Sequence, residues 1–394
     1  MSRTGPYRWM ILLLGTYVVI CYGFVFQTIP PILASLIEDL SLSHTKAAAL
    51  MGSFAIPAIF VAIPAGFLVD RFGAKVVGIS GLLVFATGSS IVATGGDYTT
   101  QLLGRVVSGT GAVVLLVFIP GMIAHWFKDA ELGVAIGVFN AAVPIGTVCA
   151  MMGLGVLGAS HGWNTVLTVS AAVSVSALVV FLLFYRAPDG EVDGNKSLKY
   201  SELKSHLHSS GRKIWWLGIG WAVFGAGYFQ FFTFAFEYFV AEGFTVQKAG
   251  LYASGPMLSG MLTGPAVGWL LDRYGRGWVF LLSGHVGLIL TLGLIPLVVE
   301  NPFALTLVIG VLASIVSTVA LALPPVIMPA HTLGFGYGLL AAMLGLGNFL
   351  GATSLGLLRD LTGIAGSVFV GAAVISLLAI PVTLALRNPE TNTE

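Results

Sequence analysis

One arginine, Arg105, stands inside a long apolar run, where its charge could bind an anionic solute or take part in proton coupling. At about 1.5 Å per helical residue, it lies on the order of 10 Å from the edge of that run. A cation at this depth is costly unless it faces protein or a water-filled cavity, which makes it a candidate functional residue. Two structural alternatives stay open: an arginine that snorkels to the interface, and one paired with a backbone carbonyl.

One acid, Glu237, also falls within an apolar run, close to the end of that run. A carboxyl group there could bind a proton during transport, or it could be an ordinary carboxylate at the membrane interface. Arg105 and Glu237 are therefore both proton-coupling candidates.

The elements that hold these side chains are set by composition. Of the 394 residues, 57% are hydrophobic and only 9% are charged, which is more apolar surface than a soluble core of this size could bury. Basic and acidic residues number 18 and 17, so no polyanionic partner such as nucleic acid is indicated. Cys21 and Cys149 lie in apolar runs, where cysteine acts as a small hydrophobe, and no disulfide or metal site is expected.

Transmembrane helices are the expected elements, because a bilayer core of about 30 Å needs roughly twenty apolar residues in a helix. The sequence predicts an all-α polytopic membrane protein with twelve such segments, at residues 9–34, 46–69, 76–94, 99–124, 132–157, 163–185, 214–240, 247–271, 278–299, 303–328, 334–358 and 364–386. We expect an N-terminal six-helix bundle at 1–186, a linker at 187–212 and a C-terminal six-helix bundle at 213–394. The first run shows no small-residue cleavage site, so we expect it to be retained as a signal anchor.

Basic residues fix the expected orientation. Fourteen Lys and Arg residues fall on the side that holds both termini and the linker, against three, Lys46, Lys248 and Arg359, on the other. The positive-inside rule then predicts a multi-pass cell-membrane protein with both termini in the cytoplasm.

The two halves repeat each other 202 residues apart. Lys46 recurs as Lys248, and Asp70-Arg71-Phe72-Gly73 recurs as Asp272-Arg273-Tyr274-Gly275. Small residues at 58, 62 and 66 recur as small residues at 260, 264 and 268. Such a parallel repeat is expected where two six-helix halves surround a site near the midplane of the membrane.

The turn after the second segment, Gly66-Phe67-Leu68-Val69-Asp70-Arg71-Phe72-Gly73-Ala74-Lys75, has the form G-x-L-x-D-R-x-G-x-K/R. It resembles the signature loop of the major facilitator superfamily. Glycines permit close helix approach and a tight turn, and the charged residues can make contacts that exist in one conformation only. We therefore expect a conformational gate formed by Gly66, Asp70, Arg71, Gly73 and Lys75, and by Gly268, Asp272, Arg273, Gly275 and Arg276 in the repeat.

Further motifs extend this resemblance along the chain. Arg105-Val106-Val107-Ser108-Gly109-Thr110-Gly111 has the R-x-x-x-G-x-G form of the superfamily's fourth helix, and Trp126-Phe127 opens a turn similar to W-F-x-x-x-E-R-G, with Leu132 in place of the usual Arg. In the fifth helix, Val143 and Thr147 replace glycines of the G-P-x-x-G-G motif of proton-coupled drug exporters, so the likeness to that subgroup is partial. Asp360 belongs to an R-D-x-T-G turn that is read as structural.

The resemblance implies a central cavity lined mainly by helices 1, 4, 7 and 10. The substrate-binding candidates are Arg105 with tyrosines and amides that could face it: Tyr22, Gln27, Tyr228, Gln230, Asn140 and Asn348. Tyr22 and Tyr228 are expected to face each other, and Asn140 to be the counterpart of Asn348. Packing of these groups between helices is the alternative reading.

The resemblance implies a secondary transporter that works by alternating access. Nucleotide-binding, metal-ligand and nucleophile motifs are missing from the sequence, so we expect neither an enzyme nor a cofactor. One buried cation and almost no buried acid favour a small organic anion, similar to a monocarboxylate, as the substrate. Symport with a proton and facilitated movement without a coupling ion are both left open, and contact with lipid and a monomeric state are further expectations. Proton-driven efflux of lipophilic compounds and a receptor or scaffold that does not transport remain as alternatives.

Overall fold

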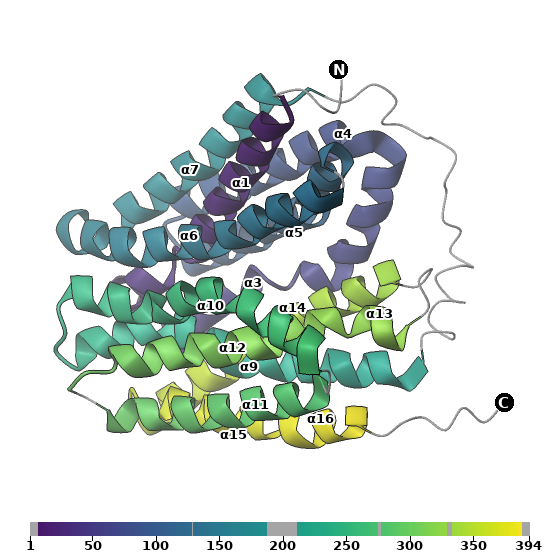
Figure 1. Ribbon diagram of the computed structural model, residues 1–394. Helices are drawn as coiled ribbons and strands as arrows, with labels where there is room; N and C mark the ends of the chain where they lie inside the picture. Colours follow the sequence, from purple (N-terminus) through teal and green to yellow (C-terminus); the bar gives the residue numbers. More distant parts are fainter. Residues whose placement is uncertain are drawn as a thin grey trace.

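A computed structural model describes residues 7–127, 129–186, 211–274, 277–298, 300–328 and 333–387 of the chain. Every regular element in these ranges is a helix (Figure 1), as the composition predicts. The predicted linker, 187–212, lies outside the described residues except for its last two positions.

The helices before the linker are α1 (Tyr7–Phe26), η1 (Pro30–Ile32), α2 (Leu33–Asp39), α3 (His44–Ser53), α4 (Ala58–Thr94), α5 (Tyr98–Trp126), α6 (Asp129–His161) and α7 (Trp163–Phe184). Those after it are α9 (Gly211–Ala241), α10 (Val246–Tyr274), α11 (Gly277–Leu294), η2 (Ile295–Leu297), α12 (Phe303–Ala322), α13 (Pro324–Ile327), α14 (Leu333–Thr362), α15 (Ser367–Leu377) and α16 (Ala379–Arg387).

Eleven segments of the described chain are long and apolar enough to cross a membrane. The remaining predicted segment, 247–271, is helical as part of α10, which has 29 residues but is not among those eleven. Glycine, serine and two prolines, Pro256 and Pro265, dilute its apolar residues. Small residues of this kind let helices pack closely, at the expense of hydropathy.

Some predicted helices are interrupted where backbone chemistry requires it. The second predicted segment is divided into α3 and the start of α4 by a turn at 54–57 that ends in Pro57. α4 then continues through Gly73, whose φ of 77° and ψ of 158° mark a sharp kink within it. Glycine occupies this region without the steric penalty that a Cβ atom brings.

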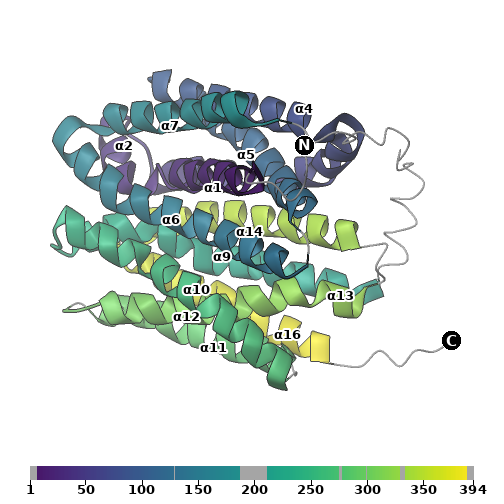
Figure 2. The same ribbon diagram turned by 45° about the horizontal axis from the view of Figure 1, so that its top comes forward.

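The helices gather in two groups, α1 to α7 in one and α9 to α16 in the other, in both views (Figure 1, Figure 2). α3 and α4 pack against α14, and α6 packs against α10, across the boundary between the groups. The division into two six-helix bundles remains a prediction; the residues on either side of the linker are called the two halves.

Close helix crossings recur in both halves at spacings of 201 and 202 residues. A Cβ atom at Gly23 of α1 would lie 2.6 Å from the carbonyl oxygen of Val143, and one at Gly225 of α9 would lie 2.9 Å from that of Leu344. Likewise a Cβ at Gly109 would overlap the carbonyl oxygen of Phe54, and one at Gly310 that of Pro256. Each pair needs glycine because two backbones touch.

Candidate functional site

A cavity of about 980 Å³ lies between the two halves. It extends from Tyr22, Thr147 and Asn348 toward Pro120 and Tyr337, which lie near the helix ends on one side of the protein. We name that side the terminal end. There the chain's first described residue, Tyr7, donates a hydrogen bond to the carbonyl of Phe184 (2.9 Å) and its ring meets Trp126 (5.2 Å).

The cavity wall is almost wholly apolar. Its described lining holds Phe26, Phe54, Phe229 and Phe335 with many small aliphatic residues. Polar side chains enter it only from Tyr22, Thr147, Tyr337 and Asn348, and no charged residue is among the described lining. Such a cavity can hold an apolar body and offers a few hydrogen bonds to fix its orientation.

Arg105 lies one layer behind this wall. Its residue is 2% exposed and its guanidinium lies 4.4 Å from the ring centroid of Phe54, which does line the cavity. Nε donates to the Leu50 carbonyl (3.0 Å), Nη1 to Val25 (3.0 Å) and Nη2 to Phe26 (3.2 Å). These carbonyls belong to the last turns of α1 and α3, where helices lack internal donors.

Arg105 therefore joins two helix ends, which is the carbonyl-paired arrangement that the sequence left open. No described carboxylate lies within ion-pair distance of its guanidinium, so the carbonyls solvate the charge without neutralising it. Arg105 belongs to α5, and the start of that helix fixes its position along the protein. Asp97, the N-cap of this helix, accepts from the Thr100 hydroxyl (2.6 Å) and the Thr100 N–H (3.0 Å), and these two hydrogen bonds lower the pKa of the exposed Asp97 carboxyl.

Asn348 is the amide that faces the cavity, and its hydrogen bonds fix its orientation. Gln230 Nε2 lies 3.2 Å from the Gly225 carbonyl and 3.1 Å from the Asn348 backbone carbonyl, so it must be the donor. The Asn348 side-chain atom 3.1 Å from the same nitrogen is therefore the acceptor, Oδ1. Thr233 donates to Gln230 Oε1 (3.3 Å) and holds that amide in place. The Asn348 NH2 group is thus left for the cavity.

The other substrate-binding candidates divide between the wall and the packing around it. Tyr22 lines the cavity with Asn348, while Gln230 supports Asn348 from behind. Tyr228 is buried and stacks on Phe224 at 4.9 Å. Gln27 is also buried, and neither of its amide atoms has a hydrogen-bond partner among the described residues. Asn140 is exposed and absent from the described lining.

The repeat also aligns residues differently from the sequence expectation. The helix crossings place Tyr22 at the level of Phe224 and Phe26 at that of Tyr228, so the two tyrosines do not face each other as counterparts. On α6 and α14 the equivalent crossings are 201 residues apart, with Gly146 against Ile20 and Gly347 against Ala222, and this makes Thr147 the counterpart of Asn348. Thr147 lines the cavity, is fully buried and has no described partner for its hydroxyl.

The predicted gate lies at the terminal end. Gly66 lines the cavity there, Gly73 forms the kink, and the guanidinium of Arg71 lies 5.3 Å from the Phe72 ring. Lys75 is exposed. In the repeat, Gly268 belongs to α10 and Arg273 lies 5.3 Å from the Trp269 ring.

The side chains of Asp70 and Asp272, and the whole of Gly275 and Arg276, lie outside what the structure describes. No hydrogen bond or ion pair between described residues joins the two gate segments.

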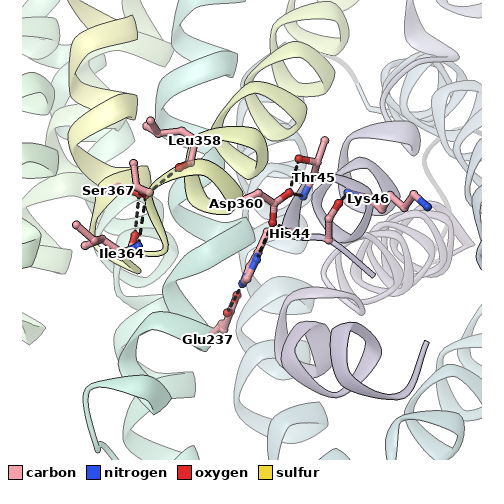
Figure 3. Close-up of polar contacts among 10 residues, drawn as sticks. His44, Thr45, Lys46, Glu237, Leu358, Asp360, Ile364 and Ser367 are labelled. Atoms are coloured by element: carbon pink, nitrogen blue, oxygen red, sulfur yellow. Dashed lines mark hydrogen bonds and ion pairs between the residues drawn. The ribbon is translucent and has the colours of Figure 1, made fainter. Parts of the chain in front are cut away.

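Polar contacts between the halves gather at the opposite side, which we name the latch end. Asp360 of α14 accepts from the backbone N–H groups of His44 (2.7 Å) and Thr45 (2.9 Å), and from the Thr45 hydroxyl (2.6 Å). The His44 ring lies between Asp360 and Glu237 (Figure 3). His44, Thr45, Glu237 and Asp360 are named the latch cluster. Among described residues, every side-chain hydrogen bond between the halves belongs to it.

Comparison with known proteins identifies the family. The family model described as Major Facilitator Superfamily matches residues 16–302 and 239–394, which together span nearly the whole chain. The chain belongs to the major facilitator superfamily. The resemblance seen in the signature loop is thereby confirmed, and the protein is a membrane transporter for a small molecule.

Individual relatives of this superfamily member transport different solutes. It is 26% identical over 279 residues to the probable nitrate/nitrite transporter NarK2 of Mycobacterium tuberculosis (strain CDC 1551 / Oshkosh), covering 69% of each chain. It is 21% identical to the lysosomal dipeptide transporter MFSD1 of Danio rerio, covering 95% of this chain and 86% of the relative. Its fold matches the crystal structure of a mutant of the nucleoside transporter NupG with a TM-score of 0.81 at 17% identity, over 96% of this chain and 100% of that one.

Sequence reasoning missed three residues of this superfamily member: His44 and Thr45, which belong to the latch cluster, and Thr147, which lines the cavity. His44 and Thr45 meet Asp360, which is more than 300 positions away, so spacing gives no signal for the contact. The presence of Ser43, a helix N-cap that accepts from the Lys46 N–H (3.2 Å), does mark where α3 begins. Thr147 was noted only as a glycine replacement; the 202-residue repeat pairs it with Phe349, and only the helix crossings pair it with Asn348.

Proposed function

We propose that this protein transports a small organic monoanion with an apolar body, such as an aromatic or branched aliphatic monocarboxylate. One observation carries the proposal: an apolar cavity of about 980 Å³, free of described acidic residues, has an unneutralised guanidinium directly behind its wall. The apolar wall suits the body of the solute, and the buried charge suits its carboxylate.

The charge acts through Phe54. A solute atom touching the far face of the ring at about 3.5 Å would lie about 8 Å from the guanidinium, given 4.4 Å to the near side. At an effective dielectric constant of about 20, unit charges at that distance attract by about 2 kcal/mol. An attraction of this size strengthens the binding of an anion roughly thirtyfold and weakens the binding of a cation by the same factor.

Two hydrogen-bond donors in the wall suit the same group. The Asn348 NH2 group faces the cavity from α14, and the Thr147 hydroxyl of α6 lies buried in the wall at the matching position, with no partner among the described residues. Oxygen atoms of a carboxylate accept from both kinds of donor.

The transport cycle proposed here is alternating access, with symport of a proton. The cavity extends to the terminal end, while the latch cluster joins the halves at the other, so this conformation corresponds to one of the two states of such a cycle. Basic residues support placing both termini, and therefore the terminal end, in the cytoplasm of a cell-membrane protein. A monomer suffices, because the cavity is built within one chain.

A second candidate function is export of uncharged lipophilic compounds. It is favoured by the wall itself, which brings no described charged side chain into contact with the solute. The related proteins do not decide between the two, since their names refer to nitrate or nitrite, dipeptides and a nucleoside.

The test uses solutes that differ only in charge. Purified protein in liposomes is expected to exchange benzoate and branched short-chain carboxylates, and to bind benzoate at least tenfold more tightly than benzamide. Equal exchange of benzamide and other neutral compounds would favour lipophilic export. Binding of benzoate without exchange would instead support a receptor that does not transport.

Asn348→Leu is expected to weaken benzoate binding about tenfold, because a hydrogen bond to a charged group contributes roughly 1.5 to 3 kcal/mol. The fold should persist, since Gln230 keeps its bonds to the backbone carbonyls of residues 225 and 348. Asn140→Leu is the matched control, because Asn140 lies outside the described lining. Isothermal titration measures both variants; an equal loss of affinity in the two would contradict the assignment of Asn348.

A further inference from the structure

The latch cluster contains a contact that cannot be made without an additional proton. Figure 3 shows the His44 ring between two carboxyl groups, with Nδ1 3.0 Å from Asp360 Oδ1 and Nε2 3.3 Å from Glu237 Oε1. Neutral imidazole has one N–H group, and an ionised carboxylate has none. Both ring contacts therefore form only if the cluster carries one proton more than it would with a neutral His44 and two ionised carboxylates.

The position of that proton follows from the partners of Asp360. Both of its oxygens accept from groups that can only donate there, the N–H groups of His44 and Thr45, so Asp360 is an acceptor. Its contact with the ring then requires the hydrogen of Nδ1. In a neutral ring whose hydrogen is on Nδ1, Nε2 carries only a lone pair, and this lone pair faces Glu237. The additional proton therefore lies between Nε2 of His44 and Oε1 of Glu237.

The other charged groups near the latch cluster have partners elsewhere or take no part in the contact between His44 and Glu237. Arg359, adjacent to Asp360, adds a positive charge near His44. On the same helix as His44, the Lys46 ammonium lies 5.8 Å from the Tyr98 ring of α5. Asp97 caps α5, and on α2 Asp39 accepts from the Trp163 indole (2.6 Å), with Glu38 beside it.

We propose that His44 and Glu237 form a proton-binding site that holds the latch end closed. The proton joins α3 of one half to α9 of the other, and its loss leaves the Nε2 lone pair and a carboxylate facing each other. Because the closed latch binds one more proton than the open one, a rise in pH on that side favours opening. The inference rests on the proposed alternation between the two ends, and is independent of the solute.

The proton exchanges with water at the latch end. The side chains of His44, Glu237 and Asp360 keep exposed fractions of 21%, 16% and 23%. None of the three belongs to the described lining of the cavity. The site therefore sets the balance between the two conformations according to the pH outside that end, and it does not carry the proton with the solute.

The variants separate a proton site from a simple contact. In Glu237→Gln, the amide NH2 can donate to the Nε2 lone pair of a neutral ring, so the contact no longer needs the proton. This variant is expected to stay closed at alkaline pH, where the native protein opens. In His44→Gln the ring is lost, and the ratio of closed to open molecules is expected not to vary with pH through this site.

The experiment measures the distance across the latch end by electron spin resonance in lipid nanodiscs, without solute. Spin labels are placed at Ala159 and Ala241, which are exposed near the ends of α6 and α9, in a protein lacking Cys21 and Cys149. In otherwise native protein the closed-to-open ratio should fall by up to about tenfold per pH unit, the limit for one proton.

Two results would overturn the inference: a distance that is independent of pH in the native protein, or an unchanged pH slope in either variant. Asp360→Ala removes the acceptor shared by His44 and Thr45, and should open the latch end at every pH. If Asp360→Ala also leaves the distance unchanged, the proposed alternation of the two ends fails as well.

Discussion

Arg105→Met should abolish the preference for benzoate over benzamide and destabilise the protein at the same time. The guanidinium donates to three buried carbonyls of α1 and α3. A methionine removes the donor of the Phe26 carbonyl, and it leaves Val25 with only the Thr28 N–H (3.3 Å) and Leu50 with only the Ser53 hydroxyl (3.0 Å). The cost is on the order of 3 kcal/mol, since buried acceptors lose charge-assisted bonds. This exceeds the roughly 2 kcal/mol expected for attraction of an anion at about 8 Å, so stability falls more than affinity.

The measurement must therefore separate binding from stability. Thermal unfolding in detergent reports the loss of stability. The ratio of benzoate to benzamide affinity reports the loss of binding preference, because both solutes experience the same loss of folded protein. Arg105→Lys keeps the charge but not the planar fork of donors, so it should be destabilised while retaining most of the preference. If Arg105→Met keeps the native preference for benzoate, Arg105 is a structural residue alone.

Gly109→Val is expected to yield almost no folded protein. A Cβ atom at Gly109 would overlap the Phe54 carbonyl oxygen and lie 2.8 Å from its carbonyl carbon. Both atoms belong to the backbone, so no change of rotamer relieves the clash, and α5 must move away from the turn that holds Phe54 over Arg105. We expect less than about a tenth of the native yield of monodisperse protein.

Gly121→Val serves as the matched control. It lies on the same helix, and nothing stands within 4 Å of its Cβ position. Its yield in size-exclusion chromatography should be close to that of the native protein. A similar loss in both variants would show that valine itself, and not the close crossing at Phe54, disturbs α5.

The location of the polar residues shows where sequence reasoning reached its limit. Tyr22 and Asn348 were expected at the substrate and do line the cavity, whereas Gln27 and Tyr228 are buried outside its described lining. All of them lie in or next to apolar helices that pack on several sides. A one-residue step turns a helical side chain by about 100°, so hydropathy alone does not indicate which neighbour it meets.

Arg105 illustrates the same limit for a charged residue. Its depth in an apolar run marked it correctly as a group that must face protein or water. Whether it meets a solute or a carbonyl depends on where α1 and α3 end, and on the direction in which those ends point. The structure places it behind Phe54, with effects on both stability and the field in the cavity.

The sequence by itself determined the class of the protein, the positions of its helices, the repeat of its halves and its superfamily. These depend on local properties: apolar length, basic residues in short loops, and a loop motif with its copy. Only the tertiary structure decided that Thr147 is the counterpart of Asn348 and that His44 lies between Glu237 and Asp360. Such contacts join helices hundreds of residues apart, and they arise from the packing of whole helices rather than from any local pattern.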